Sequence, residues 1–180
     1  MRNGVRALTG TLVAALLLLG FGTAGPATAA TGEPRSVTAL ANAFHPIKNV
    51  GTGKCLQPQG GSPAVRTLIV PESCNGSAAQ GWLEQRVGNH HYWFINQGTG
   101  SCLDVDDGIG NGAPVRLGIC RAISDQEFNT DVDLPGVSVV LESRLDFRDN
   151  DVCVTSEDVA RLRACNPLSP AQHWTIGLDV

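Results

Sequence analysis

The sequence has 180 residues, of which 42% are hydrophobic and 17% are charged, and its formal net charge is −4. Of its 13 basic side chains, Arg2 and Arg6 lie in a segment expected to be removed, which leaves 11 against 17 acidic ones. This balance excludes the basic face that a nucleic-acid partner would need, and about 150 residues fit one domain with a single core.

The N-terminus has the pattern of an export signal. Two arginines precede an apolar run from Leu8 to Phe21, and small residues follow, ending in Ala27-Thr28-Ala29. The run is too short to span a membrane and no later run is longer, so residues 1–29 are predicted to be a cleaved signal peptide and no membrane span is expected. A secreted protein is therefore expected, with a flexible terminus at residues 30–36 and one domain at 37–180.

A unit of two cysteines followed by a Gln-x-aromatic motif then occurs three times. The three glutamines lie 46 residues apart in both intervals, which is typical of a fold assembled from repeated units, with repeats at about 40–87, 88–134 and 135–178. The residues of the units, copy by copy, are Cys55, Cys74, Gln80 and Trp82; Cys102, Cys120, Gln126 and Phe128; and Cys153, Cys165, Gln172 and Trp174.

Short apolar runs broken by Gly, Asn, Asp and Pro predict many short strands. The stretch Ile47–Leu56 is echoed by Ile95–Leu103, with Asn, Gly, Thr and Gly at matching places before the cysteine, and each predicts a hairpin with a tight turn. Four strands per copy make twelve, and no long helical periodicity appears after the signal, so an all-β domain is predicted. Further strands are expected at Val65–Pro71, Val115–Ile119, Val159–Leu162, Tyr92–Ile95 and Val137–Leu141, and a third hairpin at Phe147–Val154.

Three copies that cannot each bury a core must share one, which suggests a barrel with pseudo-three-fold symmetry. The aromatic residues of the three motifs would meet around the axis as the largest contributors to the core. The three glutamines beside them are expected to satisfy buried backbone groups, so they are interpreted as architecture.

Six cysteines in an exported chain predict three disulfides. Six cysteines allow 15 pairings, but if the repeats share one local structure the self-similar choice is one bridge within each repeat: Cys55 with Cys74, Cys102 with Cys120, and Cys153 with Cys165. The alternative of a metal site is weaker, because no Cys-x2-Cys occurs and the histidines are not spaced to join the cysteines. No cofactor and no metal are expected.

These residues resemble the ricin B-type lectins, β-trefoil domains with a disulfide and a Gln-x-Trp motif in each of three repeats. The resemblance covers roughly residues 44–178 and implies a β-trefoil fold with three lobes around a shared core. It also implies binding of galactose, xylose or related sugars, free or in a polysaccharide, in shallow pockets, one for each lobe.

A competent pocket in that family has an aspartate two residues after the first cysteine, a polar residue four before the second, and an aromatic ring two before it. The first copy places Gln57, Val70 and Glu72 at these three positions, and the third places Thr155, Arg161 and Arg163. The second copy keeps the aspartate as Asp104 and offers Arg116, but Gly118 stands where the ring should be. No copy has the ring that would cover the apolar side of a sugar.

Asp104 is the best candidate for a sugar contact, supported by Arg116, Asp125, Gln126 and Asn111. The alternative is a solvated turn with a structural Asp–Arg pair. The run Asp104–Gly108 also suggests a calcium-binding loop, but it lacks the residue spacing of an EF-hand and the glutamate that ends one.

No catalytic motif is assembled anywhere in the sequence, so the chain is predicted not to be an enzyme. We expect a secreted, monomeric carbohydrate-binding module with degenerate sugar pockets, of which the second repeat keeps the best. The alternative is a trefoil that binds a protein instead, as a protease inhibitor or as a toxin or adhesion subunit, which the three missing rings favour.

Overall fold

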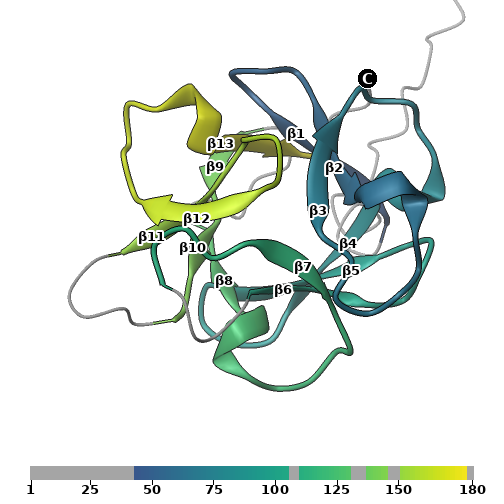
Figure 1. The fold of residues 1–180 in the computed structure, drawn as a ribbon. Helices are drawn as coiled ribbons and strands as arrows, with labels where there is room; N and C mark the ends of the chain where they lie inside the picture. Colours follow the sequence, from purple (N-terminus) through teal and green to yellow (C-terminus); the bar gives the residue numbers. More distant parts are fainter. Residues whose placement is uncertain (1–42, 106–109, 131–136, 146–150, 178–180) are drawn as a thin grey trace, which may run out of the picture. The chain divides into compact units, whose positions relative to one another are not determined.

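A computed structural model describes residues 43–105, 110–130, 137–145 and 151–177, and within them the chain is all-β. Thirteen strands are joined by tight turns and four 3-10 turns, and the described residues contain no α-helix. All thirteen strands belong to one hydrogen-bonded network (Figure 1). The prediction of an all-β fold is thereby confirmed.

Six strand positions close on themselves to form a barrel. Strand β1 pairs with β4, β4 with β5, β5 with β8 and β8 with β10, while β9 pairs with β13 and β13 returns to β1. Closure leaves no open sheet edge around the barrel. The bounds are β1 (His45–Asn49), β4 (Gly81–Arg86), β5 (His91–Asn96), β8 (Phe128–Asn129), β9 (Ser138–Val140), β10 (Glu142–Ser143) and β13 (His173–Ile176).

Strands β9 and β10 explain why thirteen strands are present where twelve are predicted. They occupy the place that β1 and β5 hold in the other repeats, and only Leu141 separates them. Leu141 is fully buried, as are Ile47 of β1 and Phe94 of β5, two residues before Asn49 and Asn96. The interruption is therefore local, and each repeat contributes four strand positions as expected.

Three antiparallel hairpins surround a common centre in the view of Figure 1. Near that centre, equivalent residues from the three hairpins are joined through their main chains. The Ala160 amide donates to the Ile69 carbonyl at 2.9 Å, and the Val115 amide donates to the Ala160 carbonyl at 2.8 Å. The Leu117 amide closes the ring on the Thr67 carbonyl at 2.8 Å. The hairpins are β2 (Cys55–Pro58) with β3 (Ile69–Glu72), β6 (Cys102–Val105) with β7 (Val115–Gly118), and β11 (Val152–Thr155) with β12 (Arg161–Ala164).

The core is built in layers of three equivalent side chains. Trp82, Phe128 and Trp174 are all fully buried and belong to one core cluster, as the sequence predicts. The Trp82 indole N–H donates to the Leu56 carbonyl at 2.9 Å, and that of Trp174 donates to the Val154 carbonyl at 3.0 Å. Each indole thus fixes the strand that carries the first cysteine of its own repeat.

All three disulfides lie within single repeats. The structure pairs Cys55 with Cys74, Cys102 with Cys120 and Cys153 with Cys165, which confirms the self-similar choice among the possible pairings. Each bridge ties the start of a hairpin to the segment that leads into the Gln-x-aromatic motif. Two expected segments cannot be compared with the structure. Residues 37–42 lie outside the described residues, and so do Asp149 and Asn150 of the turn expected in the third hairpin.

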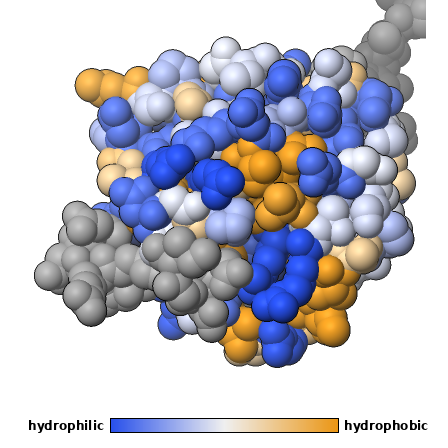
Figure 2. All heavy atoms as spheres, viewed as in Figure 1, coloured by the Kyte–Doolittle hydropathy of each residue, from blue (hydrophilic) through white to orange (hydrophobic). Residues whose placement is uncertain are grey.

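The surface over the hairpins is mostly hydrophilic, but Figure 2 shows apolar side chains reaching the surface near the middle of this face. Hydrophilic residues surround this apolar area in the same view. A continuous apolar area framed by polar groups is the usual form of a contact surface.

Candidate functional site

The hairpin register places the pocket positions of each repeat directly opposite one another. Gln57 pairs with Val70, Asp104 pairs with Arg116, and Thr155 pairs with Arg161. Directly opposed side chains on an antiparallel pair lie on the same face of the sheet and interact. Each hairpin therefore presents its two candidate polar positions side by side, and what differs between the repeats is only the chemistry placed there.

The glutamine of each Gln-x-aromatic motif holds the residue at the aspartate position. Its Nε2 donates to Gln57 Oε1 at 2.9 Å in the first repeat, to Asp104 Oδ2 at 2.7 Å in the second and to Thr155 Oγ1 at 3.0 Å in the third. The same amide bridges backbone: in the third repeat Nε2 donates to the Ala164 carbonyl at 3.0 Å, and Oε1 accepts from the Asn166 amide at 2.6 Å. The three glutamines are 0 to 3% exposed, so they serve the framework.

The second repeat alone carries a carboxylate at this position, and the protein itself occupies both of its oxygens. Asp104 Oδ1 accepts from Arg116 Nε at 2.8 Å, and Oδ2 accepts from Gln126. The Asp104 side chain is only 4% exposed, whereas the Arg116 side chain is 15% exposed. A ligand approaching from solvent would therefore meet the guanidinium before the carboxylate.

The place where the family has a stacking ring holds no ring in any repeat. In the second repeat, a Cβ built on Gly118 would overlap the Asp104 carboxylate, so Asp104 itself fills that space. In the third repeat, Arg163 makes a two-pronged ion pair with Glu157, with Nε to Oε1 at 2.6 Å and Nη2 to Oε2 at 2.8 Å. The hydrogen bonds from Arg163 lower the pKa of the Glu157 carboxyl, and Glu157 in turn raises the pKa of Arg163.

The other two candidates, Asp125 and Asn111, lie outside strands β6 and β7 of the second hairpin. Asp125 is half-buried in the 3-10 turn Ser124–Gln126, next to Gln126, and Ser124 Oγ donates to its Oδ1 at 3.4 Å. Asn111 is exposed, and its neighbour Gly112 donates to the Leu162 carbonyl of the third repeat at 2.7 Å. The structure thus joins Asp104, Arg116 and Gln126, sets Asp125 beside them in sequence, and directs the Asn111 loop toward another repeat.

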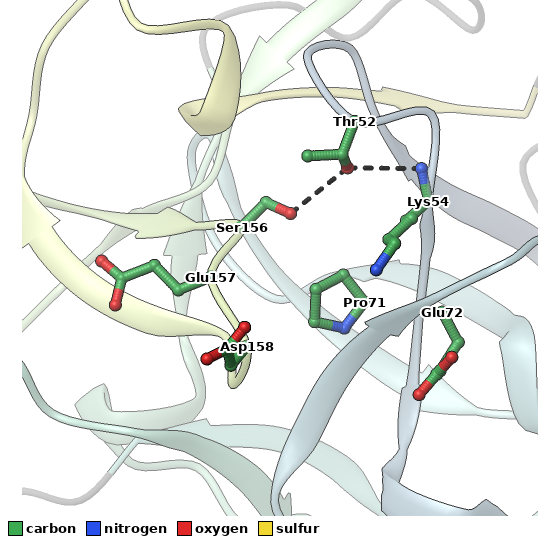
Figure 3. A pocket seen from close by; sticks show the side chains of 7 residues that line it. All are labelled: Thr52, Lys54, Pro71, Glu72, Ser156, Glu157 and Asp158. Carbon is green, nitrogen blue, oxygen red and sulfur yellow. Dashed lines mark hydrogen bonds between the residues drawn. The ribbon is translucent and has the colours of Figure 1, made fainter.

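A polar pocket of about 410 Å3 lies between the first and third repeats, where the sequence gives no signal of a site (Figure 3). Lys54, Pro71 and Glu72 line it from the first repeat, and Ser156–Asp158 line it from the third. Thr52 Oγ1 and Ser156 Oγ lie 3.4 Å apart across the boundary. The sequence could not reveal this pocket, because its two walls are about 100 residues apart and meet only when the barrel closes.

The described part of the chain shows neither a metal-binding cluster nor a membrane-spanning helix. No group of three or more His, Cys, Asp and Glu side chains there is arranged to hold a metal ion. None of the described helices is both long and apolar enough to pass through a bilayer. Asp106 and Asp107, on which the calcium alternative depends, lie outside the described residues.

Comparison with known proteins agrees with this geometry. Residues 38–118 match the family described as ricin-type beta-trefoil lectin domain-like. Comparison of the sequence with curated proteins gave no significant match.

Several solved structures share the fold. The designed three-fold symmetric protein ThreeFoil aligns with a TM-score of 0.65 and 19% identity, over 76% of this chain and 99% of that one. An exo-β-1,3-galactanase from Clostridium thermocellum aligns with a TM-score of 0.65 and 23% identity, over 76% of this chain but only 30% of the enzyme. A ricin B-like lectin from Macrolepiota procera, solved with lactose, aligns with a TM-score of 0.56 and 14% identity, over 76% of this chain and 95% of the lectin.

The family match over 38–118 and the fold shared with these structures both indicate a ricin-type β-trefoil architecture. The three disulfide-linked hairpins, the shared aromatic core and the repeated glutamine network supply the structural part of the same conclusion. The chain thus has a β-trefoil fold, and its residues 38–118 match the ricin-type beta-trefoil lectin domain-like family.

Proposed function

We propose that this protein is a secreted carbohydrate-binding module that binds weakly through its second repeat and has no catalytic activity of its own. The observation that carries the proposal is the Asp104 carboxylate, held between Arg116 and Gln126 in the only repeat that keeps an acid at this position. A carboxylate fixed in this way orients the Arg116 guanidinium, whose N–H groups are suited to sugar hydroxyls.

In this arrangement Asp104 is a positioning residue, and the contacts to sugar come from Arg116 and from Asp125 on the adjacent turn. Weak binding follows from the missing ring, because Gly118 offers no surface to cover the apolar side of a sugar. The ligand class is a galactose-type or xylose-type sugar, free or within a polysaccharide, and the module acts as a monomer.

The test is a glycan array with a polysaccharide pull-down on residues 30–180, using Asp104→Ala and Arg116→Ala. Both variants should lose the sugar signal while their circular dichroism remains that of the native fold. Thr155→Ala is the matched control, because Thr155 fills the equivalent position in the third repeat and accepts from Gln172 in the same way. A sugar signal that survives in Asp104→Ala would place the site elsewhere.

Export is proposed on two grounds, the signal pattern in residues 1–29 and the three disulfides, which persist in oxidising compartments. N-terminal sequencing of the protein recovered from culture medium should begin near Ala30. Recovery of the uncleaved chain from the cytosol, with reduced cysteines, would contradict this.

The second candidate function is binding to a protein, and the apolar area on the hairpin face favours it (Figure 2). The absence of a ring at Glu72, Gly118 and Arg163 is consistent with this alternative. A blank glycan array together with inhibition of a protease from a standard panel would replace the carbohydrate proposal by this one. Release of sugar from a glycoside by the purified protein would contradict both.

A further inference from the structure

The middle residue of the Gln-x-aromatic motif differs between the repeats, and in the first repeat it is a glycine that lines a pocket. This residue is Gly81 in the first repeat, Glu127 in the second and His173 in the third. Its backbone has the same extended conformation in all three, with φ/ψ of −81/131, −98/126 and −96/132 degrees. Any residue can adopt this conformation, so the backbone does not require a glycine at position 81. Gly81 differs from Glu127 and His173 only in lacking a side chain.

In the other two repeats the protein fills this place itself. Glu127 forms an ion pair with Arg144, and the Arg144 amide donates to the Glu127 carbonyl at 2.9 Å. The His173 ring lies 3.0 Å from Ser138 Oγ through Nδ1 and 3.0 Å from the Pro167 carbonyl through Nε2. In the second and third repeats the side chain at this position therefore has partners in neighbouring segments of the protein.

In the first repeat the Gln97 side chain lies where a side chain at position 81 would start, and Gly81 and Gln97 together line a pocket of about 590 Å3, which we call the Gly81 pocket. Its backbone frame matches the others, because the Gln97 amide donates to the Gly81 carbonyl at 2.8 Å, as Arg144 does to Glu127 and Val50 to His173. Gln97 is the equivalent of Arg144, and a Cβ built on Gly81 would overlap its side-chain oxygen. The other lining residues used in the argument below are Phe44, Pro46, Asn75 and Ser77.

The lining of the Gly81 pocket has the chemistry that binds sugars. Phe44 is 42% exposed and offers the ring face that all three family pockets lack. Asn75 and Gln97 are exposed amides, and Ser77 is an exposed hydroxyl, all able to exchange hydrogen bonds with sugar hydroxyls. Among the described residues, no ionisable side chain lines this pocket, in contrast to the pocket of Figure 3 with Lys54, Glu72, Glu157 and Asp158.

We infer that the Gly81 pocket is a second carbohydrate site, for a neutral saccharide that stacks on Phe44 and bonds to Asn75, Ser77 and Gln97. A volume of about 590 Å3 lies within the range of small-molecule sites. The site is separate from the second-repeat site. None of the three family pocket positions of the first repeat, Gln57, Val70 and Glu72, lines it.

The test is an NMR titration of the 15N-labelled secreted protein with three neutral disaccharides, lactose, xylobiose and cellobiose. At least one should shift the amides of residues 75–81 and 97. The double variant Gly81→Glu/Gln97→Arg copies the ion pair that the second repeat already carries at this place, and it should abolish these shifts. Phe44→Ala should weaken binding about three- to tenfold, as expected for one lost ring contact, and its exposure makes it harmless to folding.

Asn75→Ala should weaken binding as well, and Asn166→Ala is its matched control. Both asparagines follow the second cysteine of their repeat and donate their backbone amide to the motif glutamine, at 2.7 and 2.6 Å. Asn166 does not line the pocket, so its variant should bind as the native protein does.

The location of the shifts separates this site from the second-repeat site. Shifts confined to residues 104–126 would support the second-repeat proposal and overturn this one, and shifts confined to residues 75–81 and 97 would do the reverse. Unchanged binding in a folded Gly81→Glu/Gln97→Arg variant would overturn the Gly81 pocket, and an absence of any shift would overturn both sites.

Discussion

At the scale of single residues, the most repeated device in this protein is a buried glutamine that satisfies two chain segments at once. In the third repeat Gln172 donates to Thr155 and to the Ala164 carbonyl and accepts from the Asn166 amide. Such a side chain has no apolar substitute, because its removal leaves buried groups without partners.

Gln172→Ala should therefore lower the free energy of unfolding by about 2–4 kcal/mol, since it removes three hydrogen bonds and orphans their partners. Urea denaturation followed by fluorescence measures this. Gln85→Ala, at an exposed position on β4, is the control and should change the free energy of unfolding by less than about 0.5 kcal/mol. Equal effects of the two substitutions would show that the glutamine network carries no stability.

Glu157 gives a pH-dependent prediction. Because Arg163 lowers the pKa of the Glu157 carboxyl in the folded protein, the pair stabilises the fold above the ordinary pKa of glutamate, and this stabilisation disappears as pH falls through the lowered pKa. Glu157→Gln should lower stability at pH 7 by up to about 1 kcal/mol, because the pair is partly exposed. The difference between variant and native protein, measured by thermal melts, should vanish once the pH is below the lowered pKa of Glu157; a difference that grows on acidification would contradict the ion pair.

At the residue scale, the sequence predicts which residue stands at each pocket position better than it predicts how exposed that residue is. The identity of each pocket position follows from its distance to a cysteine, and the register confirms that Asp104 lies opposite Arg116. That both Asp104 oxygens are occupied could not be predicted, because it depends on where the Arg116 and Gln126 side chains point. The pocket beside Gly81 could not be predicted from the sequence either, because the lack of a side chain at position 81 becomes informative only when the three folded repeats are compared.

At the scale of elements, each hairpin is closed by one disulfide, and the loops differ in length. The bridges span 19, 18 and 12 residues in the first, second and third repeats. In the chain-entropy account, stabilisation grows only with the logarithm of loop length, so the shortest bridge should be nearly as valuable as the longest.

Replacing both cysteines of one bridge by alanine should lower the free energy of unfolding by about 3 kcal/mol in each repeat. The pair Cys153/Cys165 should cost only about 0.4 kcal/mol less than Cys55/Cys74. Urea denaturation of the two double variants gives the comparison. A gap of several kcal/mol would show that loop closure in the unfolded chain is not the main effect of these bridges.

The sequence predicts that these segments form strands, but it does not predict where each strand begins and ends. The run Val159–Leu162 was expected to form a strand, whereas β12 covers Arg161–Ala164, and Val65–Pro71 yields only Ile69–Glu72. The missing residues still make cross-repeat bonds, such as Ala160 to the Ile69 carbonyl. Local apolar patterning cannot separate pairing within a hairpin from bonding across the axis, because both bury the same side chains.

At the scale of the whole domain, no repeat buries its core alone. Strand β1 of the first repeat pairs with β13 of the third, and β5 pairs with β8 and β4. Trp82, Phe128 and Trp174 belong to a single cluster. The three-fold arrangement was predictable because the period of 46 residues is explicit in the sequence, whereas the pockets between repeats were not.

Residues 38–118, which match the family on their own, should therefore not fold when expressed alone. The fragment lacks β13 beside β1 and the Phe128 and Trp174 rings, so its apolar faces stay open to water. Its one-dimensional proton NMR spectrum should show the narrow dispersion of an unfolded chain, while that of residues 30–180 is well dispersed. A monomeric fragment with native dispersion would contradict the shared core.

The bonds from Val115 to Ala160 and from Ala160 to Ile69, with the bond from Leu117 to Thr67 that completes the ring, use only main-chain atoms. Ile69, Val115 and Ala160 hold equivalent positions in the three repeats. Every residue type brings the same carbonyl, and all but proline bring the same amide, so these junctions persist through almost any substitution. The three positions already hold three different side chains. The three repeats can therefore differ on their outer surfaces while the axis stays intact, as the Gly81 pocket of the first repeat and the Glu127–Arg144 ion pair of the second show.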